Sequence, residues 1–513
     1  MGRAKEYRQR LKYQVASVRK KTLESLLAVR FSSELGMSET EARLLGYRLS
    51  RWILFRPEVR GPNQILFEAV AGRESFSRRH KVFKAVKLTP YDAEDLDLEL
   101  EFGLWAMQLG RMLRLIEEAY CQDALLTGKQ LTLLCNITPT SLRRRLREVR
   151  TAGIWAPVAG LGRAERETAG QPRSTWVLAG HLQGLPPMEL RRAAALSRER
   201  FRNLLVRFAH VARLVQAGGF EPQEPEEAGW AALVEKAPAN RLAHLLNEPG
   251  VAPDTGDWNT FRAGLEVDFA LSPVKVRAVG EIVGELLSAL SGERSAGDVV
   301  YWAVASTEPA GKPLEACRLV PVTLTLHDPV DVPPPEADRD INRLSGIKLA
   351  KVARCCAQAK RGGGYLTYAD LSYLLGIHPE AIARLVRSNP QVVIPLRGAE
   401  CDIGRGVTHR GKIIRLYLEM HTETEIVSRT GHSYEAVENY IKEFAAVLVL
   451  AERGLTAPMI RRVTGRSMRL VNTYLELIRE YSGPVYAFRL HHLRKVFQVH
   501  EAELKKNPRG ARR

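Results

Sequence analysis

Apolar residues recur every three or four positions along most of the chain, a spacing that predicts a mainly α-helical protein. One clear example covers residues 127–150, where Leu131, Leu142 and Leu146 would share a buried face. Thr138-Pro139 divides this stretch, and it pairs a good N-cap residue with the residue best tolerated at the first position of a helix. The pattern therefore predicts two short helices joined by a tight turn, which is the arrangement of a helix-turn-helix.

The chain repeats itself at long range. The segment LTGKQLTLLCNITPTSLRRRL, which begins at Leu126, aligns with LTYADLSYLLGIHPEAIARLV, which begins at Leu366. Further along, the surroundings of Phe208 recur around Phe444, and TLESLLAVRFSSELG near the N-terminus resembles TFRAGLEVDFALSPV. We therefore predict a tandem pseudo-repeat of helix-turn-helix or winged-helix units with small β-hairpin wings.

The predicted organisation has four parts. The first copy covers 1–218, a linker rich in Pro and Glu covers 219–256, the second copy covers 257–490, and a basic tail covers 491–513. Helix-turn-helix segments are expected near 127–150, 185–208, 367–388, 423–445 and 456–476. The second copy carries HDPVDVPPPEAD, where consecutive prolines cannot continue a helix. It should therefore lack or shorten a helix that begins near Pro90 in the first copy, or carry a loop there.

Within the helix-turn-helix segments, the apolar period separates inward from outward positions. Near 185–208 the inward residues should be Leu190, Leu196, Phe201 and Leu205, and the outward ones Arg191, Arg192, Arg198, Arg200 and Arg202. Near 423–445 the inward residues should include Ile426, Val437, Tyr440 and Ile441. Thr422 or Thr424 can cap the first helix of that segment.

A wing is predicted at 394–416, directly after the helix-turn-helix of the second copy. An apolar run, a bend at Gly404 and Gly406, and a second apolar run are typical of a short β-hairpin. The alternative is an interdomain turn whose glycines only meet backbone demands.

Charge narrows the class of partner. The chain has 76 Lys and Arg against 58 Asp and Glu, which gives a net charge of +18 and a pI near 9.7. Such an excess favours a polyanion, and double-stranded DNA is the first expectation, with RNA or an acidic protein as alternatives. The sequence shows no apolar run long enough to span a bilayer and no signal-peptide core at its N-terminus. We therefore expect a soluble, cytoplasmic protein without a membrane partner, associated with the nucleoid if it binds DNA.

Basic residues on the second helices and on the wing are the candidate DNA contacts. The helix expected at 139–150 is the most basic, with Arg143, Arg144, Arg145, Arg147 and Arg150 spread around its exposed side. Cationic side chains would contact phosphates, whereas Thr, Asn and His could read base edges. The full candidate set is Thr140, Arg143, Arg144, Arg147, Arg150, Arg198, Arg202, Arg384, Arg387, Arg397, Arg405, His409, Arg410, Lys412, Asn439, Lys442, Arg466 and Arg469. The alternative is a set of solvated basic faces on ordinary helical hairpins, and the basic termini allow the same two interpretations, arms on phosphates or solvated tails.

No cofactor, metal site or catalytic centre is predicted. The six cysteines include no CxxC pair, and the three histidines near the C-terminus have no cysteine partners. The motifs of phosphate loops, zinc proteases and serine hydrolases do not occur. His409-Arg410, Gly431-His432 and Tyr440 distantly resemble the C-terminal boxes of tyrosine recombinases, which act on a scissile phosphate with Arg, His and Tyr. Here, however, the Arg directly follows the His, and the earlier Arg and the hairpin Lys of those enzymes are not found.

Two segments resemble a prokaryotic family known as domain of unknown function 1670. They are EEAYCQDALLTGKQLTLL at 117–134 and, within 397–444, RGAECDIGRGVTHRGKIIRLYLE with TGHSYEAVENYIKEF. The resemblance implies a fold and no activity, because the family pattern is a helix-turn-helix, a loop containing DIG and a second helix-turn-helix. This chain carries the pattern twice, with AERETAGQPRSTW in place of the loop in the first copy and QAKRGGGYLT in place of the EAY…LLT signature in the second.

These observations together predict a sequence-specific or structure-specific DNA-binding protein, not an enzyme. It would be a transcription regulator or the DNA-binding subunit of a mobile element. An internal duplication imitates a twofold dimer, which suggests two related half-sites on the DNA. The alternatives are a helical protein-interaction scaffold, an RNA-binding subunit of a larger complex, and a DNA strand transferase similar to tyrosine recombinases.

Overall fold

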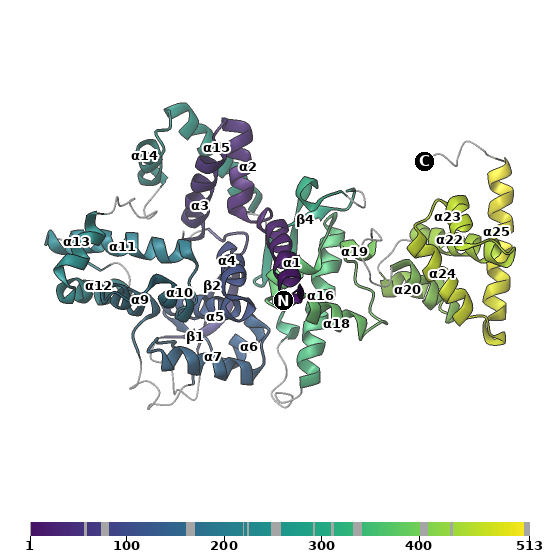
Figure 1. Ribbon diagram of the computed structural model, residues 1–513, viewed down its shortest axis with the longest axis horizontal. Coiled ribbons are helices and arrows are strands. Elements are labelled where there is room, and N and C mark those ends of the chain that lie inside the picture. Colours follow the sequence, from purple (N-terminus) through teal and green to yellow (C-terminus); the bar gives the residue numbers. More distant parts are fainter. Residues whose placement is uncertain are drawn as a thin grey trace. The chain divides into compact units, whose positions relative to one another are not determined.

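A computed structural model describes residues 2–55, 59–72, 82–160, 170–218, 220–222, 225–247, 258–290, 293–308, 312–331, 341–400, 409–430 and 434–506. Within these ranges the protein is mainly helical, with two small sheets, which confirms the predicted class at that level (Figure 1). The chain forms two compact units. The larger comprises Met1–Ala303, Pro321–Lys351 and Tyr368–Ile382, and the smaller comprises Val304–Val320, Val352–Thr367 and Ala383–Arg513.

The first copy lies within the larger unit. Its elements are α1 (Gly2–Arg19), α2 (Leu23–Leu35), α3 (Glu39–Phe55), β1 (Ile65–Ala71), β2 (Phe83–Leu88), α4 (Ala93–Phe102), α5 (Leu104–Cys121), β3 (Ala124–Leu125), α6 (Gly128–Cys135), α7 (Pro139–Thr151), α9 (Arg173–Leu182), α10 (Pro187–Ala193) and α11 (Arg198–Gln216). The helix-turn-helix segments predicted near 127–150 and 185–208 are therefore the pairs α6–α7 and α10–α11.

The second copy repeats this order. Its elements are α14 (Trp258–Asp268), α15 (Pro273–Leu290), β4 (Asp298–Ala305), η1 (Leu314–Ala316), β5 (Leu319–Thr325), η2 (Pro329–Asp331), α16 (Ile341–Arg361), β6 (Gly364–Tyr365), α17 (Tyr368–Leu375), α18 (Pro379–Arg387), α19 (Arg397–Glu400), α20 (His409–Leu418), α21 (Glu423–Thr430), α22 (Tyr434–Glu452), α23 (Ala457–Thr464), α24 (Met468–Glu480), η4 (Pro484–Tyr486) and α25 (Ala487–Lys506). In the described part of the proline-rich stretch, the short 3₁₀ helix η2 stands where the first copy has α4, as the prolines predicted.

The two sheets have matching topologies. Their strand orders are β2-β1-β3 and β5-β4-β6. In the first sheet Val70 pairs with Leu125 across β1 and β3, and in the second Val304 pairs with Tyr365 across β4 and β6, both antiparallel. In each copy a two-residue strand directly before the helix-turn-helix therefore closes onto an upstream hairpin strand.

The predicted wing at 394–416 is wrong. Its described residues form a loop, α19 and the start of α20, and residues 401–408 lie outside the described ranges. Ile413, Ile414, Tyr417 and Leu418 are all buried, and this spacing places them on one side of a helix, not on alternating faces of a strand. The hairpin strands of each copy lie upstream of the helix-turn-helix, as β1–β2 and β4–β5.

The predicted linker at 219–256 also needs correction. Residues 225–247 form α12 (Pro225–Lys236) and α13 (Ala239–Asn247), and α12 packs against both α9 and α11. Trp230 of α12 is fully buried, with its ring edge-to-face on Phe208 at a centroid distance of 6.5 Å. The acidic, proline-containing sequence is typical of a linker, but its apolar residues complete the core of the first copy.

The N-terminal helix pairs of both copies share one core in the larger unit. Phe31 of α2, Leu45 of α3, Phe261 of α14 and Val279 of α15 are buried in the same cluster. The four helices lie together in Figure 1. The N-terminal helix pairs of the two copies are therefore packed against each other within the larger unit.

Contacts between the copies in the larger unit are reciprocal. The Leu66 amide donates to the Ala296 carbonyl at 2.8 Å, and the Val300 amide donates to the Pro62 carbonyl at 2.7 Å. Adding the same 234 positions to Leu66 and Pro62 gives Val300 and Ala296, so one hydrogen bond is the image of the other. This part of the fold has the contact pattern of a twofold dimer inside one chain.

Side chains extend this reciprocity. The Arg60 guanidinium donates to the carbonyls of Ser295 and Ala296 at 2.9 and 2.7 Å, and the Arg294 guanidinium donates to the Gly61 carbonyl at 3.1 Å. Each arginine thereby adds side-chain hydrogen bonds to main-chain carbonyls of the neighbouring copy.

The first helix of each helix-turn-helix unit is contacted in the same way by the long helix that precedes the other unit. Arg111 of α5 donates to the carbonyls of Tyr373 and Leu374, at the end of α17, at 2.7 and 3.3 Å. Lys351 of α16, at the equivalent position, donates to the Leu133 carbonyl at the end of α6, at 3.0 Å. A buried cation at a helix C-terminus satisfies free carbonyls and interacts favourably with the helix dipole. The two helix-turn-helix units are thus joined by a buried cation from each copy.

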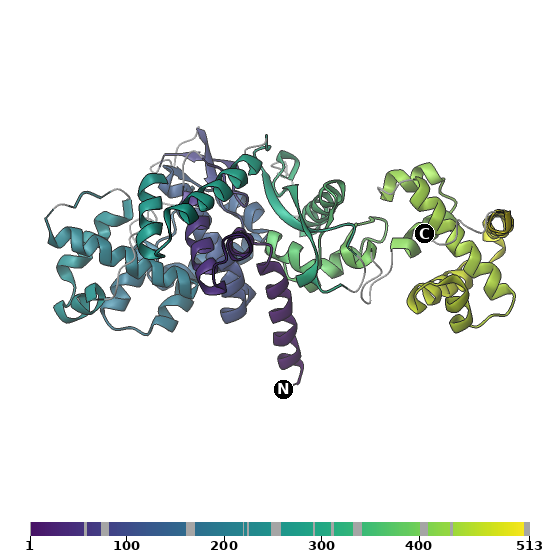
Figure 2. The same ribbon diagram turned by 90° about the horizontal axis from the view of Figure 1, so that it is seen from above.

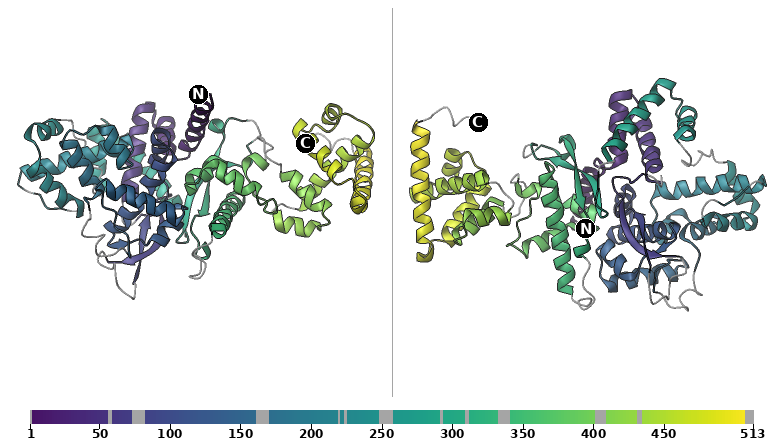
Figure 3. Two further views of the ribbon diagram at one scale, coloured as in Figure 1. Left: turned by 60° about the horizontal axis from the view of Figure 1, so that its bottom comes forward. Right: turned by 180° about the vertical axis from the view of Figure 1, so that it is seen from behind.

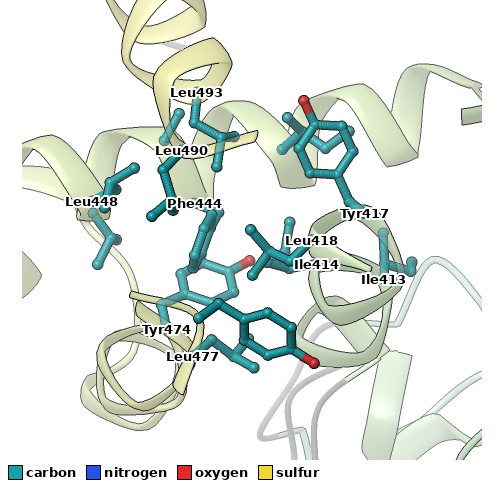
Figure 4. Close-up of a cluster of buried hydrophobic side chains, with 14 of the residues drawn as sticks. Ile413, Ile414, Tyr417, Leu418, Phe444, Leu448, Tyr474, Leu477, Leu490 and Leu493 are labelled. Atoms are coloured by element: carbon teal, nitrogen blue, oxygen red, sulfur yellow. The ribbon is translucent and has the colours of Figure 1, made fainter. Parts of the chain in front are cut away.

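The smaller unit ends in a helical bundle formed by α20–α25 (Figure 3). Its core is one cluster that includes Ile414, Tyr417, Phe444, Tyr474 and Leu493 (Figure 4). The rings of Phe444 and Tyr474 meet edge-to-face at a centroid distance of 5.2 Å, as Phe208 and Trp230 do in the first copy. Two helix-turn-helix pairs, α21–α22 and α23–α24, therefore share a single core.

Candidate nucleic-acid interface

The α6–α7 pair is closed by the local signals that the sequence predicts. Thr127 and Gln130 form a capping box at the start of α6. Asn136 takes the left-handed conformation that ends α6, with φ at 53°. The Thr138 hydroxyl then accepts a hydrogen bond from the Ser141 amide at 3.2 Å, and Pro139 is the first residue of α7. Each end of the turn is therefore fixed by hydrogen bonds that leave α7 with a defined outward face.

The outward face of α7 is basic. Leu142, Leu146 and Val149 are buried, whereas Thr140, Arg143, Arg144 and Arg147 are exposed. Arg143 and Arg147 have no hydrogen-bond or ion-pair partner among the described residues, while Arg144 lies 3.9 Å from Glu148. Unpaired guanidinium groups on one side of a second helix are suited to phosphate contact.

Two arginines predicted to be outward are not freely exposed on α7. Arg145 is 1% exposed, and its guanidinium donates to the side chain of Gln108. Burial lowers the pKa of Arg145 to about 10. Its guanidinium carbon lies 3.6 Å from the ring centre of Trp105, and that of Arg144 lies 4.0 Å from the same ring. Trp105 therefore holds one arginine inside and a second at the edge of the exposed face, while Arg150 is half-buried.

The α10–α11 pair uses part of its positive charge internally. Arg191 is buried and pairs with Glu101, and Arg200 lies 3.4 Å from Glu94 and 3.6 Å from Glu117. Burial alone would lower the pKa of Arg200, but the two carboxylates raise it. Both arginines were predicted to be outward, and both instead join α10–α11 to α4 and α5. Arg198 and Arg202, the two candidate contacts on α11, are exposed.

The inward residues of α10–α11 are largely as predicted. Leu190, Leu196 and Phe201 are buried. Leu205 is only half-buried, and its neighbour Leu204 faces the core instead. The difference is one position, within the rotation that packing of a long helix allows.

The second helix-turn-helix, α17–α18, turns at Gly376, whose φ of +66° favours glycine. Pro379 is the first residue of α18, as predicted. Arg384 and Arg387, further along α18, are exposed. This helix carries fewer cations than α7.

The candidate residues of the predicted wing do not form one surface. Arg397 is buried, and its guanidinium donates to the Cys317 sulfur at 3.4 Å, so its assignment to an exposed wing is wrong. Arg405 lies outside the described residues, and His409 is described only in its backbone, as the first residue of α20. Lys412 is half-buried, which lowers its pKa.

One carboxylate holds two of the candidate arginines in the smaller unit. Glu443 of α22 lies 3.1 Å from Arg410 and 2.7 Å from Arg466. The Arg410 guanidinium also lies 5.1 Å from the ring centre of Tyr440. These two arginines therefore connect α20, α22 and the turn before α24, whatever else they contact.

The same geometry bears on the recombinase alternative. Tyr440 is half-buried, and burial raises the pKa of its hydroxyl. A nucleophilic tyrosine is instead activated by an environment that favours loss of the proton. The packing of Tyr440 is that of a structural aromatic residue.

The α21–α22 pair carries a weakly basic surface. The Thr422 hydroxyl and the Glu425 carboxylate form a reciprocal cap on α21, which confirms Thr422 as the capping residue. Asn439 is exposed, and Lys442 lies 3.0 Å from Glu438. With Glu435 also exposed, the outward face of α22 is a poor phosphate-binding surface.

The α23–α24 pair carries exposed arginines on both helices. Arg461 and Arg462 of α23 and Arg479 of α24 are exposed, and Ser467 caps α24 by accepting from the Leu470 amide at 3.2 Å. Arg469 is described only in its backbone. Sequence reasoning located this pair but did not select Arg461 or Arg462 as contacts.

A buried ionic cluster in the larger unit was not predicted. Lys21, between α1 and α2, lies 2.6 and 2.7 Å from the two carboxylate oxygens of Asp370 in α17, and the Tyr301 hydroxyl donates to the same carboxylate at 2.6 Å. All three side chains are buried. A small cavity of about 30 Å³, roughly the volume of one water molecule, lies beside Lys21 and Tyr301 and is also lined by Glu24 and Asp92. Its size suits a structural network better than a ligand site, and the described residues hold no group of three metal-ligating side chains.

Comparison with known proteins finds one family whose model matches both copies. The model of one family, described as Protein of unknown function (DUF1670), matches residues 50–224 and 265–477, one segment in each copy. No curated protein and no solved structure matches the chain.

Among the described helices, none combines the length and apolarity needed to cross a membrane.

Proposed function

Because the chain belongs to the family described as Protein of unknown function (DUF1670), which assigns no activity, we propose from its surface chemistry that it binds double-stranded DNA through tandem helix-turn-helix units. The observation that carries the proposal is the outward face of α7, with Arg143 and Arg147 exposed and unpaired among the described residues. A net charge of +18 supports a polyanionic ligand. A transcription regulator or a mobile-element subunit would use such binding.

The mechanism proposed is binding without chemistry. Arg143, Arg144 and Arg147 would contact phosphates and supply salt-dependent affinity, and Thr140, one turn earlier, would reach base edges. The second helix-turn-helix would contribute Arg384 and Arg387. The buried cations Arg111 and Lys351 support joint action of the copies, because Arg111 of α5 contacts the end of α17 in the second copy and Lys351 of α16 contacts the end of α6 in the first.

The test is fluorescence-anisotropy binding of the full chain to duplex DNA, single-stranded DNA and structured RNA over a salt series. The variant is Arg143→Glu/Arg144→Glu/Arg147→Glu. The control is Lys236→Glu/Arg262→Glu/Arg277→Glu, which changes the net charge equally at exposed positions of α12, α14 and α15, none of which belongs to a helix-turn-helix pair.

We expect the affinity for duplex DNA at 0.1 M salt to fall by about eightfold for each phosphate contact that is lost. The slope of log association constant against log salt concentration should become shallower by about one for each such contact. The control should stay close to the unmodified chain. Equal losses in variant and control would show that only net charge matters, and tighter binding to RNA than to duplex DNA would contradict the proposal.

A second candidate function is a helical protein-interaction scaffold. It is favoured by exposed apolar side chains in the C-terminal bundle, namely Met459 and Val463 on α23 and Phe488 on α25. Exposed apolar groups in one bundle are typical of protein contacts. Loss of duplex preference in the test above would make this the better proposal.

A further inference from the structure

The N-terminal helix α1 is fixed at its C-terminal end to the second helix-turn-helix. Lys21, two residues after α1, forms the buried pair with Asp370 of α17, and the Tyr301 hydroxyl completes the carboxylate's hydrogen bonds. An ion pair with both partners under 5% exposed is a specific anchor, because either charge alone would be costly to bury. The end of α1 is therefore held at α17, 349 residues away in the sequence.

The other end of α1 reaches the turn before α18. The Tyr7 ring stacks on the His378 ring, with centroids 6.1 Å apart and planes inclined by 12°, and the Tyr7 hydroxyl lies 3.3 Å from His378 Nε2. His378 immediately precedes α18, and its Nδ1 accepts from the Glu380 amide at 3.2 Å. Contacts between α1 and α17 join these two points, so α1 runs from α17 towards the turn before α18. In Figure 2, α1 is the helix that carries the N-terminus.

Two cations of α1 remain exposed beside its packed stripe. Leu11, Val15 and Val18 are buried, and Arg19 pairs with Asp97 of α4. Arg8 and Lys12, on the same flank of the helix as Arg19, are exposed one turn apart. Neither has a partner among the described residues, so their charge is available to a ligand.

The second helix of the second helix-turn-helix is less basic than that of the first. By the offset of 240 residues, Arg144 and Arg147 of α7 recur as Arg384 and Arg387, whereas Arg143 corresponds to Ala383 and Thr140 to Glu380. In the first copy, position 370 corresponds to Gln130, which is neutral. Asp370, which anchors α1, thus occurs in the copy whose second helix is the less basic.

We propose that α1 is a DNA-binding element of the second helix-turn-helix, with Arg8 and Lys12 contacting the phosphodiester backbone beside the start of α18. This inference rests on the proposed DNA-binding function. Arg8 and Lys12 supply positive charge to the less basic α18, and the Lys21–Asp370 and Tyr7–His378 contacts hold that charge at a fixed place.

The test compares Arg8→Glu/Lys12→Glu with the charge-matched control Arg262→Glu/Arg277→Glu, both in the full chain, by anisotropy with random duplex DNA over a salt series. We expect the α1 variant to lose roughly 60-fold in affinity at 0.1 M salt and its log–log slope to become shallower by about two. Tyr7→Ala, which keeps the charge but removes the stacking interaction, should weaken binding by a smaller factor. Far-UV circular dichroism of each variant should match that of the unmodified chain, because the substituted side chains are exposed.

The outcomes separate this inference from the proposed function. If the α7 variant loses affinity while Arg8→Glu/Lys12→Glu behaves like its control, the role of α1 is overturned and DNA binding stands. If the unmodified chain shows no salt-dependent duplex binding, both proposals fail. If Tyr7→Ala binds as the unmodified chain does while the charge variant loses affinity, α1 binds DNA without being positioned by the second helix-turn-helix, and the positioning part of the proposal is refuted.

Discussion

Replacing Lys21 with Met should destabilise the larger unit strongly. Met keeps most of the apolar volume but removes the ammonium that lies 2.6 and 2.7 Å from the Asp370 oxygens. The Asp370 carboxylate would then remain fully buried with Tyr301 as a donor but without its cation. Removing one partner of a buried ion pair costs about 3–5 kcal/mol. We expect a loss of that size in the free energy of unfolding at neutral pH.

The assay can be confined to the larger unit. All seven tryptophans of the chain lie within Met1–Ala303, so their fluorescence during urea unfolding reports that unit alone. Lys21→Met, Asp370→Asn and the double variant form a thermodynamic cycle. Arg43→Met is the control, because Arg43 is mostly exposed and lies 3.8 Å from Glu39, a surface pair worth less than about 1 kcal/mol.

The double variant should be more stable than the sum of the single losses predicts, by about 2 kcal/mol or more, since it leaves no unpaired buried charge. A loss for Lys21→Met no larger than that of Arg43→Met would refute the reasoning. Strict additivity in the cycle would show that the two side chains do not act as a pair.

Three further predictions concern local features of the larger unit. Gly376→Ala should lower the free energy of unfolding by about 1–2 kcal/mol, because φ at this position is +66° and the added Cβ would meet a guanidinium nitrogen at 3.1 Å. Gly346→Ala, on the exposed side of α16, should raise the free energy of unfolding by up to about 1 kcal/mol. Burial raises the pKa of Glu24 from 4.5 to about 7, so ionisation of this carboxyl opposes folding. The free energy of unfolding should therefore fall by up to about 3 kcal/mol as the pH rises from 4.5 through 7. Urea titrations of Glu24→Gln over the same pH range should not show this fall. Burial raises the pKa of the Cys135 thiol to about 11, so Cys135→Ser should leave the number of fast-reacting thiols in the native chain unchanged, whereas Cys121→Ser should lower it by one in a colorimetric thiol assay.

Local signals predicted the helix-turn-helix units well because their causes are local. Thr138 and Pro139 begin α7 through a side-chain hydrogen bond and a fixed φ, both within a few residues. The burial of Arg145 was also available in principle, since it lies three residues after Leu142 and four before Val149, on the same face of the helix. Treating all the arginines of α7 as outward gave charge more weight than periodicity.

The contacts between copies could not be predicted from one sequence. Arg60 and Arg294 donate to main-chain carbonyls. Since every residue has such a carbonyl, no residue type in the sequence marks the acceptor of either arginine. The Lys21–Asp370 pair joins two charged residues in otherwise mixed surroundings, and only the fold shows that both are buried. The candidate DNA contacts on α7 were predicted because exposure follows from the helical period, whereas Arg397 was missed because its burial depends on a distant segment around Cys317.

The reciprocal contacts change what one substitution can do. In a homodimer each change appears on both sides of the twofold axis, and the complex dissociates on dilution. When both halves belong to one chain, their effective concentration is set by the connecting segment, and a single side can vary alone. Asp370 pairs with Lys21 in one half, whereas Gln130 occupies the matching position in the other half. Because the two halves are covalently linked, one half can carry a buried ion pair that a symmetric homodimer would have to carry twice.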